Sequence, residues 1–429
     1  MLLPAAAPAG LELSSLLSRP GGTGPGAEIG EEKMVRRAGL LVGTILVGLA
    51  WGAAGAAAQE RGTEGLPSEA VLEVTEEHTT AVLPEMGPHW VFVLDPVFPH
   101  LIAAKVYILD GDSLRYLGML NTGYVPNMAI SPDHRTIYSA ETYYSRGTRG
   151  KRTDIVAYYD ARTLEPVAET VLPEGRFLVV PKKPNLALTP DGRYLLSYNM
   201  APGTSVSVVD VVARRYVTDI EVPGCGLVFP TGNTSFSMLC PDGSFVHVRF
   251  DSAGNAEVRP GAPFFDPEED PVFEHGVVSH RDRRAFFVSY EGLVYEAEVS
   301  DAGLRIAGKW SLLGEEDRAE NWRPGGWQLL AYHAASDRLF VLMHRGGKWT
   351  HKQAGEEVWV FDANSHERVA RVPLEHHAIS VSVSQDDAPL LFTLSEEASL
   401  SVFDATSFEP RGTVEGLGDS PFLLYVADE

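Results

Sequence analysis

Basic side chains supply the most concentrated chemistry in this sequence. The densest group lies in the segment HRGGKWTHK and comprises His344, Lys348, His351 and Lys352. Such a cluster could bind an anion or a partner's carboxylate, and the plainer alternative is a solvated loop. His376 and His377 are the only adjacent histidines. Neighbours on a strand point to opposite faces, which favours a turn or surface role for this pair over a shared metal ion.

Other chemical signatures are missing from the sequence. It contains no GxSxG, no HExxH, no P-loop, no dinucleotide-binding glycine motif and no kinase signature. The acidic run Asp266–Pro271 lacks the ligand spacing and the glycine of a calcium loop, so we interpret it as a surface turn. A net charge of −23 argues against a nucleic-acid partner. An acidic chain of this kind can still attract a basic or amine-bearing ligand.

A repeated phrase indicates which elements position these residues. About every 40 to 60 residues, a short β-branched or aromatic run is followed by an aspartate and a small turn. The phrase occurs at Val106–Leu114, Ala157–Leu164, Ser207–Arg214, Val248–Asn255, Val358–Ser365 and Ser401–Phe408. A repeat of this length is typical of units that bury their faces only against one another. It predicts sheets arranged as blades around an axis.

Hairpin signals complete each unit. A polar, Asp-bearing turn followed by an alternating strand begins at each of Ser131, Thr189, Cys240, Ser279, His333 and Ser384. The strand Trp90–Asp95 and the last segment, from Pro421, each lack a partner unit, so we expect the two ends to share a blade. We therefore predict an all-β fold, a seven-bladed β-propeller over residues 86–429 with N- and C-terminal strands closing one blade. A pair of β-sandwiches is the alternative, and Glu315–Asn321 is the best helical candidate.

The beginning of the chain differs in kind. Met34–Ala58 runs from Arg36 and Arg37 through an apolar stretch to small residues, the order of a secretory signal peptide cleaved near Ala58. A retained membrane anchor is the alternative, but the apolar stretch is short for a span. We interpret residues 1–33 as a leader outside the native chain, 34–58 as the signal peptide, and 59–85 as an acidic N-terminal arm, extended or disordered.

If the protein is exported, its two cysteines, Cys225 and Cys240, lie in an oxidising compartment. An even pair in an oxidising compartment is typically bridged. A disulfide between them would close a loop of about 15 residues and stabilise the fold by roughly 3 kcal/mol on chain-entropy grounds. No CxxCH motif is present, and two cysteines do not resemble a zinc site. We therefore predict a structural disulfide between Cys225 and Cys240.

Several segments together resemble one known family. They are WRPGGWQ from Trp322, the W-x-H-K-x-A loop from Trp349, GYVPN at Gly123–Asn127, SRGTRGKRTD at Ser145–Asp154 and SVSQDDAPLLFTLS at Ser382–Ser395. The cysteine spacing around Val228 also fits the family pattern. From about Trp90 to its end, the chain resembles the heavy subunit of the quinoprotein amine dehydrogenases, the methylamine and aromatic amine dehydrogenases.

The resemblance implies a subunit of a periplasmic α2β2 heterotetramer of two heavy and two light chains. In that family the cofactor, tryptophan tryptophylquinone, is made from two tryptophans of the light chain, so we expect none in this chain. A primary amine condenses with the quinone, and a light-chain carboxylate removes a proton from the adduct. Aldehyde and ammonia are released, and electrons pass to a blue copper protein such as amicyanin or azurin. This chain would scaffold the light chain and line the substrate channel.

The resemblance also points to channel residues, within Asp95–Ala104. Phe98 is the candidate aromatic that narrows the entrance, and Leu101 is the alternative if the register of the loop differs. The alternative role for Phe98 is blade core. Trp322 and Trp327 are expected to plug blade interfaces rather than to form a cofactor.

Two other classes of function stay open at this stage. One is a stand-alone periplasmic binding or scaffold propeller without an enzymatic role. The other is a self-sufficient quinoprotein dehydrogenase with a soluble quinone in its channel, although the repeated tryptophan motifs of such a protein are not evident. Arg323 and Lys348 are candidate contacts with a light chain or an acidic electron acceptor.

Overall fold

The computed structural model describes residues 81–173 and 175–427. The predicted leader (1–33), the predicted signal peptide (34–58) and residues 59–80 of the predicted arm lie outside these described residues. Within the described ranges, no helix is both long and apolar enough to cross a membrane. Leu83, near the end of the predicted arm, is bound to a propeller turn. Its N–H donates to the carbonyl of Arg162 at 2.9 Å, and its carbonyl accepts from Arg162 Nε at 3.0 Å.

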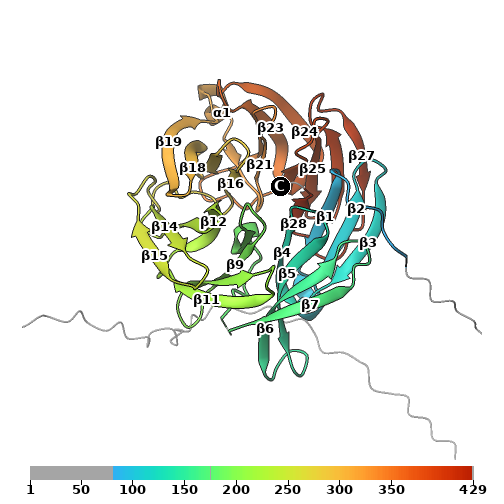
Figure 1. The fold of residues 1–429 in the computed structure, drawn as a ribbon. Helices are drawn as coiled ribbons and strands as arrows, with labels where there is room; N and C mark the ends of the chain where they lie inside the picture. Colours follow the sequence, from blue (N-terminus) through green and yellow to red (C-terminus); the bar gives the residue numbers. More distant parts are fainter. Residues whose placement is uncertain (1–80, 174, 428–429) are drawn as a thin grey trace, which may run out of the picture. The chain divides into compact units, whose positions relative to one another are not determined.

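Antiparallel sheet makes up nearly all of the regular structure (Figure 1). Five sheets have four strands each. They are β28 (Leu423–Val426), β1 (Trp90–Asp95), β2 (Lys105–Asp110) and β3 (Arg115–Asn121); β4 (Tyr124–Ile130), β5 (Thr136–Tyr144), β6 (Arg152–Asp160) and β7 (Pro166–Leu172); β8 (Leu186–Leu188), β9 (Tyr194–Asn199), β10 (Ser205–Asp210) and β11 (Arg215–Glu221); β12 (Gly226–Gly232), β13 (Ser235–Leu239), β14 (Phe245–Phe250) and β15 (Ala256–Pro260); and β16 (Val277–Ser279), β17 (Arg284–Val288), β18 (Leu293–Ser300) and β19 (Gly303–Ser311).

The remaining strands form one eight-stranded sheet. They are β20 (Trp322–Pro324), β21 (Leu330–His333), β22 (Arg338–Arg345), β23 (Gly355–Asp362), β24 (Arg368–Val383), β25 (Leu390–Ser395), β26 (Leu400–Asp404) and β27 (Pro410–Val414). Two short 3-10 segments, η1 (Phe98–Ala103) and η2 (Lys183–Asn185), precede β2 and β8. The helix α1 (Glu315–Ala319) confirms the helical candidate and ends two residues before the predicted limit.

The prediction of seven blades is wrong. Five sheets of four strands form separate blades, and the remaining described strands form a single continuous sheet. The continuity comes from β24, in which Val372 pairs with β23 while Ser382 pairs with β25. Between these two residues the sequence PLEHHAISV has no glycine or Asx turn, so the backbone stays extended and the ladder passes from one repeat into the next. The all-β propeller architecture itself is supported (Figure 1).

The two ends of the described chain meet in one sheet, as predicted. Strand β28 pairs antiparallel with β1, with Val91 opposite Val426 and Leu94 opposite Leu423. Both strands are buried along their lengths. Pairing of the last strand with the first removes the free edge that β1 would otherwise expose.

The repeated aspartate phrase forms a turn with its own side-chain cap. In the turn after β6, Asp160 Oδ1 accepts the N–H groups of the residues two and three positions later, at 2.9 and 2.8 Å. Leu164 then has φ +58° and donates its N–H to the Asp160 carbonyl at 2.8 Å. The turn after β23 repeats this with Asp362 and His366. The aspartate recurs because its carboxylate satisfies backbone donors that the tight turn leaves unpaired.

The innermost strand of each unit faces the propeller axis. Residues of β4, β8, β12, β16, β21 and β28 line a central cavity of about 480 Å³. Outside this cavity, apolar side chains fill the spaces within and between sheets, and the largest cluster contains the fully buried Trp359. The predicted disulfide Cys225–Cys240 is present and joins the entry of β12 to the exit of β13.

Candidate functional site

The loop that carries the predicted channel residues is fixed by Asp95. This side chain is fully buried, and its Oδ1 accepts the N–H of Val97 at 2.7 Å. Its Oδ2 accepts the N–H of Asp419 at 2.9 Å, which attaches the loop to the connection between β27 and β28. A Cβ on Gly418, whose φ is +85°, would lie 2.2 Å from Asp95 Oδ2, so the close approach requires glycine.

Phe98 projects from this fixed loop to the surface. Its N–H donates to Ser420 Oγ at 2.8 Å, and its ring meets the ring of buried Phe422 edge-to-face at 5.4 Å between centroids. The side chain is 38 % exposed, so the blade-core alternative does not fit it. Leu101 is half-buried within the same 3-10 segment. Phe98 is therefore the more exposed of the two candidate side chains.

Contacts continue from Phe98 across the same end of the propeller. Phe422 packs against Trp327 with centroids 5.0 Å apart, and Lys352 Nζ lies 4.0 Å from the Trp327 centroid. Lys352 also binds Glu274 at 3.0 Å, and Lys182 binds the other oxygen of that carboxylate. We call this set the aromatic–lysine cluster; its members are Phe98, Phe422, Trp327, Lys352, Glu274 and Lys182.

The charges of the cluster do not cancel. Burial works to raise the pKa of Glu274, but the charges of Lys352 and Lys182 outweigh it and hold that pKa below its ordinary value. Burial lowers the pKa of Lys352, and the carboxylate of Glu274 opposes this effect. Two lysines face a single glutamate, so the formal charge of the cluster is positive. This positive cluster belongs to a chain whose formal net charge is −23.

The basic segment singled out in the sequence contributes only part of this site. The sequence suggested that this segment could bind a partner's carboxylate. Lys352 does bind a carboxylate, but that carboxylate is Glu274 of the same chain. His344 is buried and pairs with Thr350 Oγ1 at 2.8 Å, while Lys348 lies 3.8 Å from Glu269 near the surface. Sequence reasoning missed Lys182, Glu274 and Phe422. They are far apart along the chain, and no local pattern connects them.

Of the two tryptophans expected to plug blade interfaces, Trp322 is buried, whereas Trp327 is half-buried and belongs to the aromatic–lysine cluster. Trp322 and Trp359 are buried with ring centroids 5.2 Å apart. The Arg371 guanidinium lies within 4.9 Å of both centroids. Trp322 Nε1 donates to Glu320 at 3.0 Å. Packed in this way, the pair is closed to a substrate and acts as an interface plug.

Metal chemistry finds no support in the described part of the chain. It holds no group of three or more His, Cys, Asp or Glu side chains able to bind a metal ion. His376 and His377 lie next to each other on β24, one half-buried and one exposed. The turn at Asp266 is capped by its own carboxylate, which accepts the N–H groups of Glu268 and Glu269 at 2.9 and 3.1 Å.

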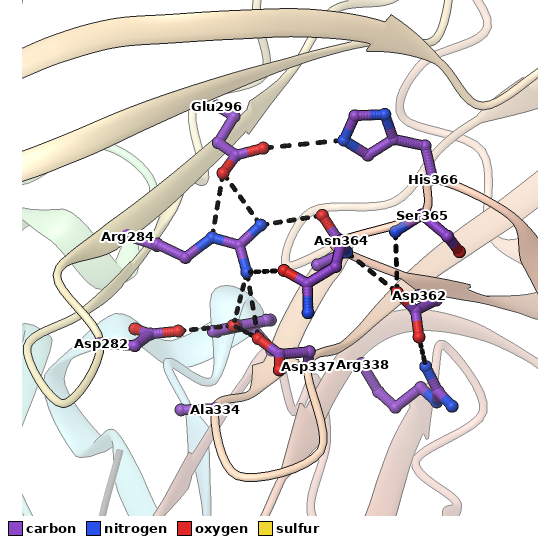
Figure 2. A network of polar contacts seen from close by, with 12 residues as sticks. Asp282, Arg284, Glu296, Ala334, Asp337, Arg338, Asp362, Asn364, Ser365 and His366 are labelled. Carbon is purple, nitrogen blue, oxygen red and sulfur yellow. Dashed lines mark hydrogen bonds and ion pairs between the residues drawn. The ribbon is translucent and has the colours of Figure 1, made fainter.

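A second polar network lies at the opposite end of β22 (Figure 2). Arg284 donates to Glu296 at 3.0 Å, to Asp337 at 3.0 Å and to the carbonyl of Ala363 at 2.8 Å. Tyr332 lies beside it and donates to Asp282 at 2.6 Å. This Arg284 network joins β17 and β18 to the turns of the eight-stranded sheet. Eight residues of β22, roughly 25 Å of strand, separate it from the loop that leads to Lys352.

Comparison with known proteins decides the family. Residues 88–428 match the family model of the methylamine dehydrogenase heavy chain. The chain belongs to this family. The methylamine dehydrogenase heavy chain of Methylophilus methylotrophus is 35 % identical over 365 residues, which cover 85 % of this chain and 90 % of that one. The heavy chain of Paracoccus versutus is 35 % identical over 382 residues, 88 % of this chain and 89 % of that one.

Solved structures agree on the fold. The Swd1 β-propeller domain of Myceliophteria thermophila superposes with a TM-score of 0.53 at 10 % identity, covering 77 % of this chain and 96 % of that domain. At such low identity the likeness concerns architecture only. Membership in the heavy-chain family, by contrast, supports a subunit of an amine dehydrogenase, an oxidoreductase, and implies a light-chain partner.

Proposed function

We propose that this chain is the heavy subunit of a periplasmic, tryptophan tryptophylquinone-dependent amine dehydrogenase that oxidises primary amines to aldehyde and ammonia. The family match over residues 88–428 carries the proposal. The order of residues in Met34–Ala58 and the disulfide Cys225–Cys240 support an exported protein. The enzyme would pass its electrons to a blue copper protein, such as amicyanin or azurin.

The light chain would dock over the aromatic–lysine cluster. An exposed phenylalanine on a loop fixed by a buried aspartate is pre-positioned, so little conformational entropy is lost when a partner covers it. The excess positive charge of Lys182 and Lys352 over Glu274 would suit an acidic surface on that partner. Two light chains and two heavy chains would form the assembled enzyme.

The quinone of the light chain supplies an electron sink for the amine. The role of the heavy chain would be to shape the path by which the amine reaches the quinone. Phe98 and Phe422 offer an apolar wall that excludes water, and the edge-to-face contact of Phe98 with the buried ring of Phe422 supports that wall. The positive charge beyond Trp327 disfavours an alkylammonium ion next to it, because like charges raise the energy of the protonated form. An amine entering here would be pushed toward its neutral, nucleophilic form.

Co-purification tests the proposal. The chain would be isolated from its native host, and amine-dependent dye reduction and quinone absorbance would be measured with and without the small partner. We expect activity and absorbance only when a light chain is present. Oxidation of amines by this chain without a second polypeptide would overturn the proposal, and so would a monomeric, colourless preparation from cells that oxidise amines. The latter outcome would favour a stand-alone binding or scaffold propeller.

A further inference from the structure

The connection between β5 and β6 carries cations that the fold does not use. Its sequence, SRGTRGK, covers residues 145–151, and the hairpin that it closes projects from the body of the propeller (Figure 1). Arg146, Arg149 and Lys151 are all exposed. Within the described part of the chain, none of these three side chains forms an ion pair. We call residues 145–151 the basic hairpin.

Backbone hydrogen bonds fix the shape of the basic hairpin. Ser145 donates its N–H to the carbonyl of Lys151 at 3.0 Å, and Arg146 donates to the carbonyl of Arg149 at 2.9 Å. Gly150 has φ +104°, and a Cβ there would lie 2.4 Å from Ser145 Oγ, so the turn requires glycine. A turn fixed in this way loses little backbone entropy when a partner binds its side chains.

Other exposed cations at this level of interest are already matched by carboxylates of the same chain. Arg323 pairs with Glu291 at 2.8 Å, and Lys348 lies 3.8 Å from Glu269. The basic hairpin has three cations without such a partner, in a chain whose formal net charge is −23. A local positive field on an acidic protein attracts an acidic surface to that one place.

The base of the hairpin is joined to the segment that leads to the aromatic–lysine cluster. Arg152 donates to the carbonyl of Arg176 at 2.8 Å, and Asp154 accepts the N–H of Arg176 at 3.2 Å. Lys182, a member of the cluster, follows Arg176 by only six residues, which span at most about 20 Å. The basic hairpin therefore lies near the surface on which the light chain would dock.

The proposed function supplies two protein partners, a permanent light chain and an electron acceptor. A permanent subunit would bury the charges of the hairpin, and buried ions lose solvation that only well-formed ion pairs offset. An electron acceptor has to leave after each transfer, and complexes of that kind have small interfaces. Exposed cations speed the encounter with an acidic protein while staying in water. The exposed charges therefore favour the electron acceptor.

We propose that the basic hairpin docks an acidic electron-acceptor protein on the assembled enzyme. Carboxylates on the surface of the acceptor would pair with Arg146 and Arg149, since a guanidinium can bind a carboxylate through two hydrogen bonds. Lys151 would add attraction as a point charge. This inference rests on the function proposed above, because only an amine-oxidising enzyme needs such an acceptor.

Association of the assembled enzyme with oxidised amicyanin, followed by surface plasmon resonance without amine, tests the inference. The variant replaces three cations: Arg146→Gln, Arg149→Gln and Lys151→Gln. Its association rate constant should fall about tenfold at about 0.01 M salt, and the difference should nearly vanish at about 1 M salt, where charges are screened. Amicyanin with amidated carboxylates should associate equally with the variant and with the unaltered enzyme.

Turnover gives a second readout. With amine present, kcat/KM for amicyanin should fall by the same factor as the association rate. Reduction of phenazine methosulfate should not change, because a small cation gains nothing from a basic docking element.

A second triple variant is the matched control: Arg115→Gln, Arg249→Gln and Lys309→Gln. These residues are exposed on β3, β14 and β19, so the control removes the same charge away from the hairpin. It should associate with amicyanin at nearly the rate of the unaltered enzyme. Thermal unfolding and light-chain content of both variants are compared first.

Equal association rates for the hairpin variant and the control would overturn the inference, as would a difference that persists at high salt. Loss of the light chain from the hairpin variant alone would overturn it too, because the hairpin would then bind the permanent subunit. Failure of the unaltered enzyme to reduce the dye with amine would overturn the proposed function together with the inference. Normal dye reduction with no effect of the hairpin on amicyanin would overturn the inference alone.

Discussion

The Arg284 network and the aromatic–lysine cluster use the same groups in opposite proportions. In the first, one arginine is surrounded by the carboxylates of Glu296 and Asp337 and by a backbone carbonyl (Figure 2). In the second, one carboxylate, Glu274, lies between two lysines, and aromatic rings extend the set to the surface. Both regions join separate sheets of the propeller.

The different proportions of cations and carboxylates indicate a different role for each region. The donors of Arg284 are used within the chain, since its three nitrogens all have acceptors. Such a network holds blades together and has little to offer a partner. The aromatic–lysine cluster keeps an excess of positive charge and an exposed phenylalanine. A binding surface requires charge and apolar area that are not already used within the chain, so the first region has the features of a stabilising network and the second has those of the partner surface proposed above.

The largest expected effect is on the Arg284 network. Arg284→Met should lower the free energy of unfolding by about 3 kcal/mol, because it leaves partly buried carboxylates without their cation. Urea unfolding measures the loss. Arg305→Met is the control: Arg305 pairs with Glu298, but both side chains are more than half exposed, so about 0.5 kcal/mol or less is expected. Equal losses in the two variants would contradict a structural role for the network.

Glu274→Gln should have a smaller effect with a defined pH dependence. The Glu274 side chain is 39 % exposed, so we expect a loss of about 1 kcal/mol at neutral pH after allowing for screening. The folded-state pKa of Glu274 lies below the ordinary value of 4.5. The stability from its ionised form is therefore present above about pH 4.5 and is lost as the pH falls through the folded-state pKa.

Unfolding free energies of Glu274→Gln and the unaltered chain should thus converge in acid. Glu291→Gln is the matched control, because Glu291 has one ion pair with Arg323 and a more exposed side chain. A difference between Glu274→Gln and the unaltered chain that stays constant from pH 7 to pH 3 would show that the ion pairs of Glu274 do not cause it.

Phe98→Ala should change stability only modestly and should act mainly on selectivity. Loss of its edge-to-face contact with Phe422 should cost about 1 kcal/mol. In the assembled enzyme, the ratio of kcat/KM for benzylamine to that for methylamine should rise about tenfold, since a wider entrance admits the larger amine. Tyr116→Ala removes an exposed aromatic from the outer strand β3 and should leave the ratio unchanged. An unchanged ratio in Phe98→Ala would remove Phe98 from the channel.

Repeating features of the fold could be predicted because their causes are local. The aspartate of each phrase caps its own turn, as Asp160 and Asp362 show, so sequence spacing reveals strand ends directly. The number of blades could not be predicted in the same way. Whether two repeats separate depends on the extended path of β24 between Val372 and Ser382, and no residue type marks a strand that passes without a turn.

The candidate site was predictable only in part, for a similar reason. Phe98 was found by resemblance, and Lys352 by its place in a dense basic segment. The partners of Lys352 come from elsewhere: Glu274 is 78 residues away, and Lys182 is 92 residues from Glu274. Their meeting is a product of the folded blades. A single carboxylate between two lysines is visible only when distant turns are brought to one end of the propeller.

The pairing of β28 with β1 makes one sheet depend on both ends of the described chain. The first sheet contains the earliest described strand and the latest one, so it stays incomplete until β28 has been synthesised. Asp95, which fixes the loop of Phe98, receives its hydrogen bonds from Asp419 and Ser420 just before that final strand. A chain that stops before Asp419 therefore lacks the long-range hydrogen bonds that fix the loop of Phe98.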